Sequence, residues 1–228
     1  MTRIETVQLV ADPYPPYQYL EGQTVRGADH DVIAAALGEQ GLHSRTRLLP
    51  WDECVRLMES GEAHGIFQIQ PTPEREKAYT FSVPLRTAKT VLFRNTQKPT
   101  DLVGTGKLRA ALEQYVLGTV KGYTYDPLID ELEEPSRIVV ESQERLLTGL
   151  SEGKFDLAII DLGVGLYLSS MLRIRNIVRV EGYEIARVLY VAFQRTLSDI
   201  SDHFNTGLEA VTKKGIRDRI LTEYGVSG

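Results

Sequence analysis

The sequence predicts an α/β protein built from two units of similar plan. Short apolar strands alternate with helices along nearly the whole chain, which is typical of parallel sheets with right-handed crossovers. Two stretches, residues 52–69 and 144–161, both contain a helix, a glycine and a buried strand, and Gly61 matches Gly153. One such copy in each unit is the interpretation we adopt. Chance similarity is the alternative, because helix–glycine–strand is common in α/β folds.

Two apolar segments, TVLFR at 90–94 and LYVAF at 189–193, are predicted to be paired strands that cross between the units. The first unit then comprises 1–95 plus 195–228, and the second comprises 96–194. Ligand sites in such proteins lie beyond the carboxyl ends of the strands, between the domains, and hinge closure is the expected motion.

The individual elements follow from apolar periodicity, prolines and glycines. Strands are expected at 6–11, 43–49, 65–69, 90–94, 118–121, 136–140, 155–160, 177–180 and 187–194. Helices are expected at about 29–40, 51–61, 73 onward, 105–115, 125–132, 143–153, 163–173 and 197–224, the last interrupted near Gly215.

Composition excludes several classes of protein. A net charge of −5 without a basic stripe argues against a nucleic-acid partner. No stretch approaches the roughly 20 apolar residues of a membrane span. Cys54, the only cysteine, forms no internal disulfide and is predicted to be a small buried apolar residue, since nothing local supplies a base. The four histidines lack ligand spacing, so neither a metal nor another cofactor is expected.

One local pattern predicts an anion site. Thr72 suits a helix N-cap, Pro73 suits the first helical position, and Arg75 lies one turn into the helix. Backbone N–H groups at a helix start attract anions, and a guanidinium can fork onto a carboxylate. The alternative is an ordinary capped helix whose arginine is solvated or paired with Glu74 or Glu76.

Polar and aromatic side chains follow the carboxyl ends of the predicted strands. Together they would supply an anion site, an acidic group for a cation and aromatic walls, which suits a zwitterion of modest size. The candidate ligand-binding residues are Asp12, Tyr14, Trp51, Gln68, Gln70, Thr72, Arg75, Lys121, Tyr123, Thr124 and Asp161.

Four of these candidates also have a purely structural interpretation. Tyr14 would then pack within a proline-rich turn, and Trp51 would be a core residue. Asp161 would cap the helix that begins near 163. Lys121 is favoured as a solvated neighbour of the site rather than a contact.

The stretch TPEREKAYTFSVPL, residues 72–85, resembles the signature of family 3 of the extracytoplasmic solute-binding proteins, which serve ABC transporters for polar amino acids. That signature is Thr-x-x-Arg followed by Phe-Ser-x-Pro, and the similarity extends from about Val7 to Tyr224. The resemblance implies the type II periplasmic binding protein fold, two α/β lobes on a two-strand hinge. It also implies a monomer that delivers a small solute to a membrane permease.

The resemblance further implies roles for individual residues. Arg75 would hold the α-carboxylate of the ligand and Asp161 its α-ammonium group. Tyr14 and Trp51 would sandwich the ligand side chain. Gln70 and Thr72 would contact the carboxylate and amine groups of the ligand. Thr124 would lie at the helix start of the second unit that closes onto the ligand's carboxylate.

The chain departs from the family pattern beside this motif. Many members have Gly-x-Thr-x-Thr where this chain has Gln68-Ile69-Gln70-Pro71-Thr72, so bulkier polar groups replace small ones and one N–H is lost. His64 stands where an acid usually precedes the strand. These changes leave open a small zwitterion or acid other than a standard α-amino acid.

Function is therefore expected to be non-catalytic capture of a polar solute. The alternatives are an enzyme resembling cyclohexadienyl dehydratases, which requires a placed acid or base, and the sensor module of a receptor. The first residues, MTRIETVQLV, lack the apolar run of a signal peptide. The chain is thus either cytoplasmic or a mature periplasmic or extracytoplasmic form with an added Met, and the resemblance favours the second.

Overall fold

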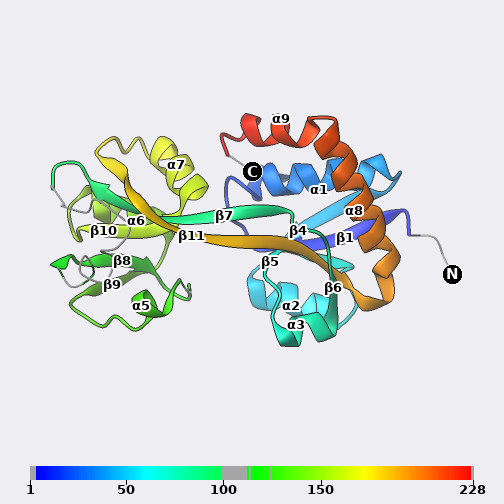
Figure 1. Cartoon of the computed structure of the whole chain (residues 1–228), viewed down its shortest axis with the longest axis horizontal. Coiled ribbons are helices and arrows are strands. Elements are labelled where there is room, and N and C mark those ends of the chain that lie inside the picture. The colour runs from blue at the N-terminus through cyan, green and yellow to red at the C-terminus, as the bar shows by residue number, and fades with distance from the viewer. Residues whose placement is uncertain (1–3, 99–111, 113, 124, 227–228) are drawn as a thin grey trace. The chain divides into compact units, whose positions relative to one another are not determined.

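The computed structural model describes residues 4–98, 112, 114–123 and 125–226. The chain divides into two compact units: unit 1 is 1–87 with 187–228, and unit 2 is 88–186. The chain passes from unit 1 to unit 2 after residue 87 and returns after residue 186. Both points lie earlier than the boundaries after 95 and 194 that the sequence predicts. They fall inside two long strands, β7 (Arg86–Asn95) and β11 (Ile177–Gln194) (Figure 1).

Unit 1 contains a mixed sheet with strand order β4-β1-β5-β11, and β6 also pairs with β11. β1, β4 and β5 run parallel, and β11 returns antiparallel to β5. Its strands are β1 (Thr6–Ala11), β4 (His43–Leu48), β5 (Gly65–Ile69) and β6 (Tyr79–Phe81), with a separate hairpin of β2 (Tyr19–Glu21) and β3 (Thr24–Arg26).

The parallel register aligns the carboxyl ends of three strands in unit 1. Ala11 is paired with Leu48, and Val10 is paired with Ile66. The residues that follow each strand therefore emerge at one edge of the sheet, as expected for parallel strands.

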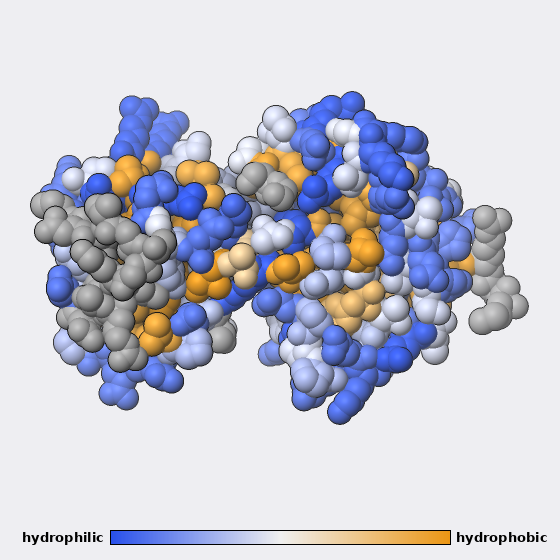
Figure 2. All heavy atoms as spheres, viewed as in Figure 1, coloured by the Kyte–Doolittle hydropathy of each residue, from blue (hydrophilic) through white to orange (hydrophobic). Residues whose placement is uncertain are grey.

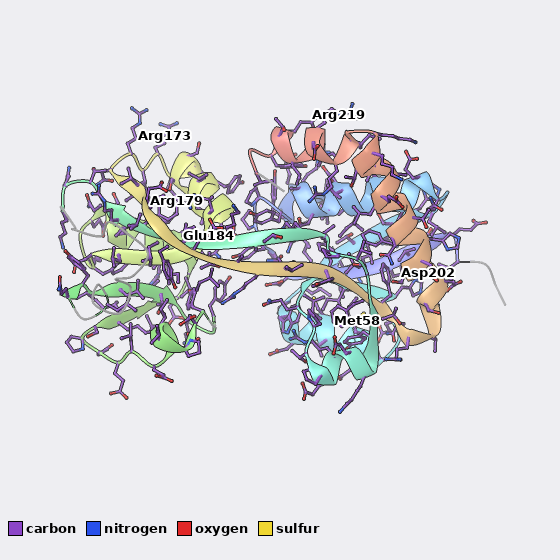
Figure 3. All side chains as sticks on the ribbon, viewed as in Figure 1. Met58, Arg173, Arg179, Glu184, Asp202 and Arg219 are labelled. Atoms are coloured by element: carbon purple, nitrogen blue, oxygen red, sulfur yellow. The ribbon has the colours of Figure 1, made fainter. Side chains whose placement is uncertain are left out.

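Five α-helices of unit 1 flank this sheet. They are α1 (Ala28–Glu39), α2 (Trp51–Glu59), α3 (Pro73–Ala78), α8 (Ser198–Lys213) and α9 (Ile216–Glu223), and a 3₁₀ turn at Arg195–Leu197 precedes α8. The expected break near Gly215 is confirmed, because this residue separates α8 from α9 with φ of 68°. Hydrophilic residues cover the outer side of α8 and α9 (Figure 2), from which Asp202 and Arg219 project (Figure 3).

The Tyr224 hydroxyl, which is partly buried, ties α9 and the residues after it to α1. Tyr224 Oη donates to Asp31 Oδ2 at 2.5 Å and accepts the Gly27 amide N–H at 3.2 Å. Burial, reinforced by this carboxylate, raises the pKa of Tyr224 to about 12. The tail of the chain is thus a structural part of unit 1.

Unit 2 contains the sheet β7-β10-β8-β9. β10 is antiparallel to β7 and parallel to β8, which is parallel to β9. Its remaining elements are β8 (Leu117–Val120), α5 (Pro127–Asp130), β9 (Arg137–Val140), α6 (Gln143–Ser151), β10 (Leu157–Asp161) and α7 (Leu162–Met171). The helix expected at 105–115 lies almost wholly outside the described residues.

One expectation about unit 2 is wrong. The sequence predicts separate strands at 177–180 and 187–194, whereas β11 is a single strand of 18 residues. Gly182 adopts φ of 85° within it, and the polar residues around this glycine hide the continuity. Arg179 and Glu184 of this strand form an ion pair at 3.1 Å (Figure 3).

Each unit has its own apolar core. Met58, Ile66 and Ala192 are fully buried in the core of unit 1, and Leu117 and Ile159 in that of unit 2. Across the described ranges no helix has both the length and the apolar character needed to cross a lipid bilayer.

The close approach of α8 to α1 gives the first prediction. A Cβ on Gly207 would lie 1.9 Å from the carbonyl oxygen of Ala36, whereas one on Gly38 would meet nothing within 4 Å. Gly207→Ala should therefore lower the free energy of unfolding by about 1–3 kcal/mol or more. Gly38→Ala should raise it by about 0.5–1 kcal/mol through helix propensity.

Urea unfolding followed by circular dichroism measures both effects. Equal stability of the two variants would contradict the packing of α1 on α8.

Candidate functional site

Unit 1 gathers seven of the sequence-predicted residues near the carboxyl edge of its parallel strands. Asp12 and Tyr14 follow β1, Trp51 begins α2 just after β4, and the others belong to β5 or follow it. The remaining four come from unit 2, and Thr124 among these lies outside the described residues.

Arg75 is the best-defined group in unit 1. Thr72 is the N-cap of α3 as predicted, and its Oγ1 accepts the Arg75 amide N–H at 3.3 Å. The guanidinium donates from Nη1 to the carbonyl oxygen of Gln70 at 3.0 Å. No carboxylate of the described part of the chain forms an ion pair with it, so Nε and Nη2 keep donors for a ligand. Among the described residues Arg75 donates to Gln70 and forms no ion pair with Glu74 or Glu76, the partners considered from the sequence.

Trp51 lies beside this arginine. The Arg75 guanidinium carbon is 5.4 Å from the centroid of the indole ring, a cation–π contact. Trp51 also packs against the core of unit 1. Both residues line a groove of about 490 Å³ between α2 and α3. The two interpretations offered by the sequence, core residue and site wall, are therefore not exclusive.

Asp12 is a partly buried carboxylate at the same edge. Burial raises its pKa above the usual 3.8, although its own backbone N–H opposes the shift. No cationic side chain in the described ranges pairs with it. Its carbonyl oxygen accepts a hydrogen bond from Nε2 of the buried Gln18 at 3.1 Å. A cationic group of a ligand would lower the cost of this charge.

The end of β5 has an unusual backbone. Gln68 adopts φ of 60°, the left-handed region that non-glycine residues rarely occupy. Its Oε1 is buried and accepts no hydrogen bond within the described structure. Such strain persists only where the surroundings enforce it and is frequent at binding sites.

Tyr14 belongs to a stack that the sequence did not reveal. Its ring lies nearly parallel to that of Tyr17, with centroids 6.1 Å apart. The Arg86 guanidinium carbon is 3.4 Å from the centroid of the Tyr17 ring. Arg86 Nε donates to both carboxylate oxygens of Asp29, at 2.8 and 2.9 Å. Both charged side chains are only 2% exposed. The sequence offered little signal for this pair, because Asp29 stands beside His30 and Asp31 in a polar helix start.

In unit 2 the structure favours the alternative interpretations of two residues. Asp161 is buried and its Oδ1 accepts the Val164 amide N–H at 3.1 Å, so it caps α7. Lys121 is exposed and pairs with Glu141 at 3.4 Å. Tyr123 is also exposed, and its Oη accepts from Gln143 Nε2 at 3.4 Å. Their contact with a ligand stays a prediction.

Cys54 belongs to the apolar core of unit 1, against which Trp51 packs. Cys54 is buried as predicted, its Sγ donates to the Leu49 carbonyl oxygen, and burial raises the pKa of the thiol to about 11. Such a thiol is a poor nucleophile. The described residues contain no cluster of potential metal ligands.

The fold is that of the solute-binding proteins among the similar solved structures. The model of the bacterial extracellular solute-binding proteins, family 3, matches residues 7–227, and the chain belongs to that family. The two-lobed fold and the family predicted from residues 72–85 are thereby confirmed.

Similar proteins include transport and sensory members. The arginine-binding extracellular protein ArtP of Bacillus subtilis (strain 168) is 23% identical over 217 residues, 92% of this chain and 82% of ArtP. The amino acid ABC transporter substrate-binding protein AbpA of Streptococcus pneumoniae Canada MDR_19A, solved bound to L-arginine, is 20% identical with a TM-score of 0.73, covering 96% and 94% of the two chains. A histidine kinase sensor domain is 19% identical with a TM-score of 0.77, covering 98% and 97%.

The raised pKa of Asp12 predicts a pH-dependent stability. A carboxyl whose pKa is raised by folding costs stability at neutral pH, and this cost disappears as the pH falls through the raised pKa toward 3.8. Asp12→Asn should therefore gain stability relative to the native, ligand-free protein at pH 7, and the gain should shrink at pH 4. Thermal unfolding at both pH values measures it. A difference that does not change with pH would contradict the buried charge.

The buried pair beneath Tyr17 gives another prediction. Arg86→Met strands the Asp29 carboxylate and should cost about 3–5 kcal/mol of unfolding free energy. The double change Asp29→Leu, Arg86→Met should recover much of this loss. Lys89→Met, which removes an exposed partner of Glu184, is the control and should cost under about 1 kcal/mol. Urea unfolding that shows equal losses for Arg86→Met and the control would contradict the prediction.

Proposed function

We propose that this chain binds a basic amino acid of the arginine type, without chemical change, and delivers it to an ABC permease. The observation that carries the proposal is the Arg75 guanidinium, which is held by Gln70 and Trp51 and is not ion-paired within the described residues. A guanidinium in this condition suits the bidentate capture of an α-carboxylate.

The choice of a basic side chain rests on Asp12. A partly buried carboxylate without a cation from the described protein suits a ligand that brings its own positive charge. The names of similar proteins support the same class, since ArtP is named for arginine and AbpA was solved with L-arginine. Tyr14, Gln68, Gln70 and Thr72 complete the contacts we propose from unit 1.

The contribution of unit 2 is proposed from the sequence pattern. Asp161 would accept the α-ammonium group, and Lys121, Tyr123 and Thr124 would be neighbours. We further propose that the chain works as a monomer outside the cytoplasm, in keeping with its extracellular family.

Isothermal titration with L-arginine, L-lysine, L-glutamine and L-glutamate tests the proposal. The native protein should bind arginine, and Arg75→Ala should weaken binding about 10- to 150-fold through loss of a charge-assisted hydrogen bond. Arg56→Ala, which removes an exposed arginine paired with Glu53, is the control and should bind normally. An unchanged affinity of Arg75→Ala would refute the carboxylate role.

A sensory role is the second candidate, because the histidine kinase sensor domain matches nearly the whole chain. Binding alone does not separate the two, so the readout must lie downstream of it. Arginine uptake by proteoliposomes that contain the permease and this chain supports transport, whereas the absence of uptake despite binding supports sensing. Product formation from prephenate or arogenate would overturn both in favour of an enzyme.

A further inference from the structure

The end of α7 exposes large apolar side chains that the solute site does not use. Met171, the last residue of α7, is 53% exposed, and Leu172, its C-cap, is 37% exposed. Val178, near the start of β11, is also exposed. Figure 2 shows apolar residues at the surface around α7. Exposed apolar side chains that gather in one short segment indicate contact with another surface.

The charged residues of this segment are all arginines. From Leu162 to Val180 the chain carries three arginines and no carboxylate. Within the described residues Arg179 pairs with Glu184 at 3.1 Å, whereas Arg173 and Arg175 are exposed and form no ion pair. The Arg173 side chain projects outward from the end of α7 (Figure 3). These two cations beside apolar side chains give the surface a basic and amphipathic character.

The carboxylate of the adjoining helix end is already paired with a cation. Ser151 Oγ donates to Asn176 Oδ1 at 2.7 Å, which places the end of α6 beside the segment. Glu152, the C-cap of α6, forms an ion pair with Lys154 at 2.7 Å. The arginines of the segment therefore keep their charge for a partner.

A structural role accounts for only part of this charge. Arg173 lies just past the C-cap of α7, where the helix dipole favours a cation. Arg175 lies two residues farther on, where that effect has faded. Met171, Leu172 and Val178 line neither of the two grooves of about 450 and 490 Å³. Because they project from the surface, they suit a broad and deformable partner.

We propose that this surface docks the protein on an anionic phospholipid bilayer. We call it the α7 patch, and it consists of Met171, Leu172, Arg173, Arg175 and Val178. Its arginines would meet lipid phosphates, and its apolar side chains would enter the boundary between headgroups and acyl chains. The whole chain carries a net charge of −5, so an anionic surface attracts it only through such a local basic patch. The inference goes beyond the proposed function and does not depend on the solute.

Co-sedimentation of the native protein with lipid vesicles tests the docking. At low salt the partition coefficient on phosphatidylglycerol vesicles should exceed that on phosphatidylcholine vesicles by about 5- to 30-fold, since each arginine near an anionic surface contributes about 5-fold. Binding to phosphatidylglycerol should weaken as the salt rises, because salt screens the charges.

Variants of the α7 patch locate the contact. The double change Arg173→Gln, Arg175→Gln should lower partitioning on phosphatidylglycerol about 5- to 30-fold. The double change Met171→Ser, Leu172→Ser should lower it about 10-fold through lost apolar burial. All four positions are exposed, so both variants should keep the native circular dichroism spectrum.

A matched control removes the same charge from unit 1. The double change Lys213→Gln, Arg219→Gln replaces two exposed cations of α8 and α9 and should leave the partitioning unchanged. Losses confined to the variants of the α7 patch support the inference. The absence of native protein from sedimented phosphatidylglycerol vesicles at low salt, or an equal loss in the control, would overturn it. The proposed function stands in either case, because arginine titration is measured without vesicles.

Discussion

A buried guanidinium–carboxylate pair holds α1 to the strand in which the chain first leaves unit 1. Arg86, the first residue of β7, lies one residue before the first crossing, and its Nε binds Asp29 in the first turn of α1. Such a pair is costly to desolvate, so its value lies in specifying one arrangement of the elements that it joins. The stack of Tyr17 and Tyr14 rests on the same guanidinium, so the candidate ligand wall shares this support.

Two arginines of unit 1 thus use the same chemistry for different ends. Arg86 is buried and forms an ion pair with Asp29, so its role is structural. Arg75 is only partly buried, makes a cation–π contact with Trp51, and has no carboxylate partner in the described ranges. The difference between an ion-paired guanidinium and one without a carboxylate partner in the described ranges is the physical basis for the role that we propose for Arg75.

The unpaired groups near the edge of the sheet carry a cost in stability. Asp12 is a partly buried carboxylate, and Gln68 is held at a left-handed φ with a buried amide oxygen. Such a loss of stability is typical of binding sites, where ligand binding compensates for it. Cys54, by contrast, is buried, donates to the Leu49 carbonyl oxygen, and has its thiol pKa raised by burial to about 11.

The sequence by itself determined the α/β class, the family, the Thr72 cap and the arginine that follows it, because apolar periodicity and helix-capping chemistry are local. Only the tertiary structure decided that β11 is one continuous strand, that Asp161 caps α7, and that Arg86 rather than Arg75 is neutralised. Pairing between residues far apart in the chain depends on which elements pack together. Arg75 and Arg86 therefore differ in ion pairing because of their three-dimensional neighbours, which the local sequence does not reveal.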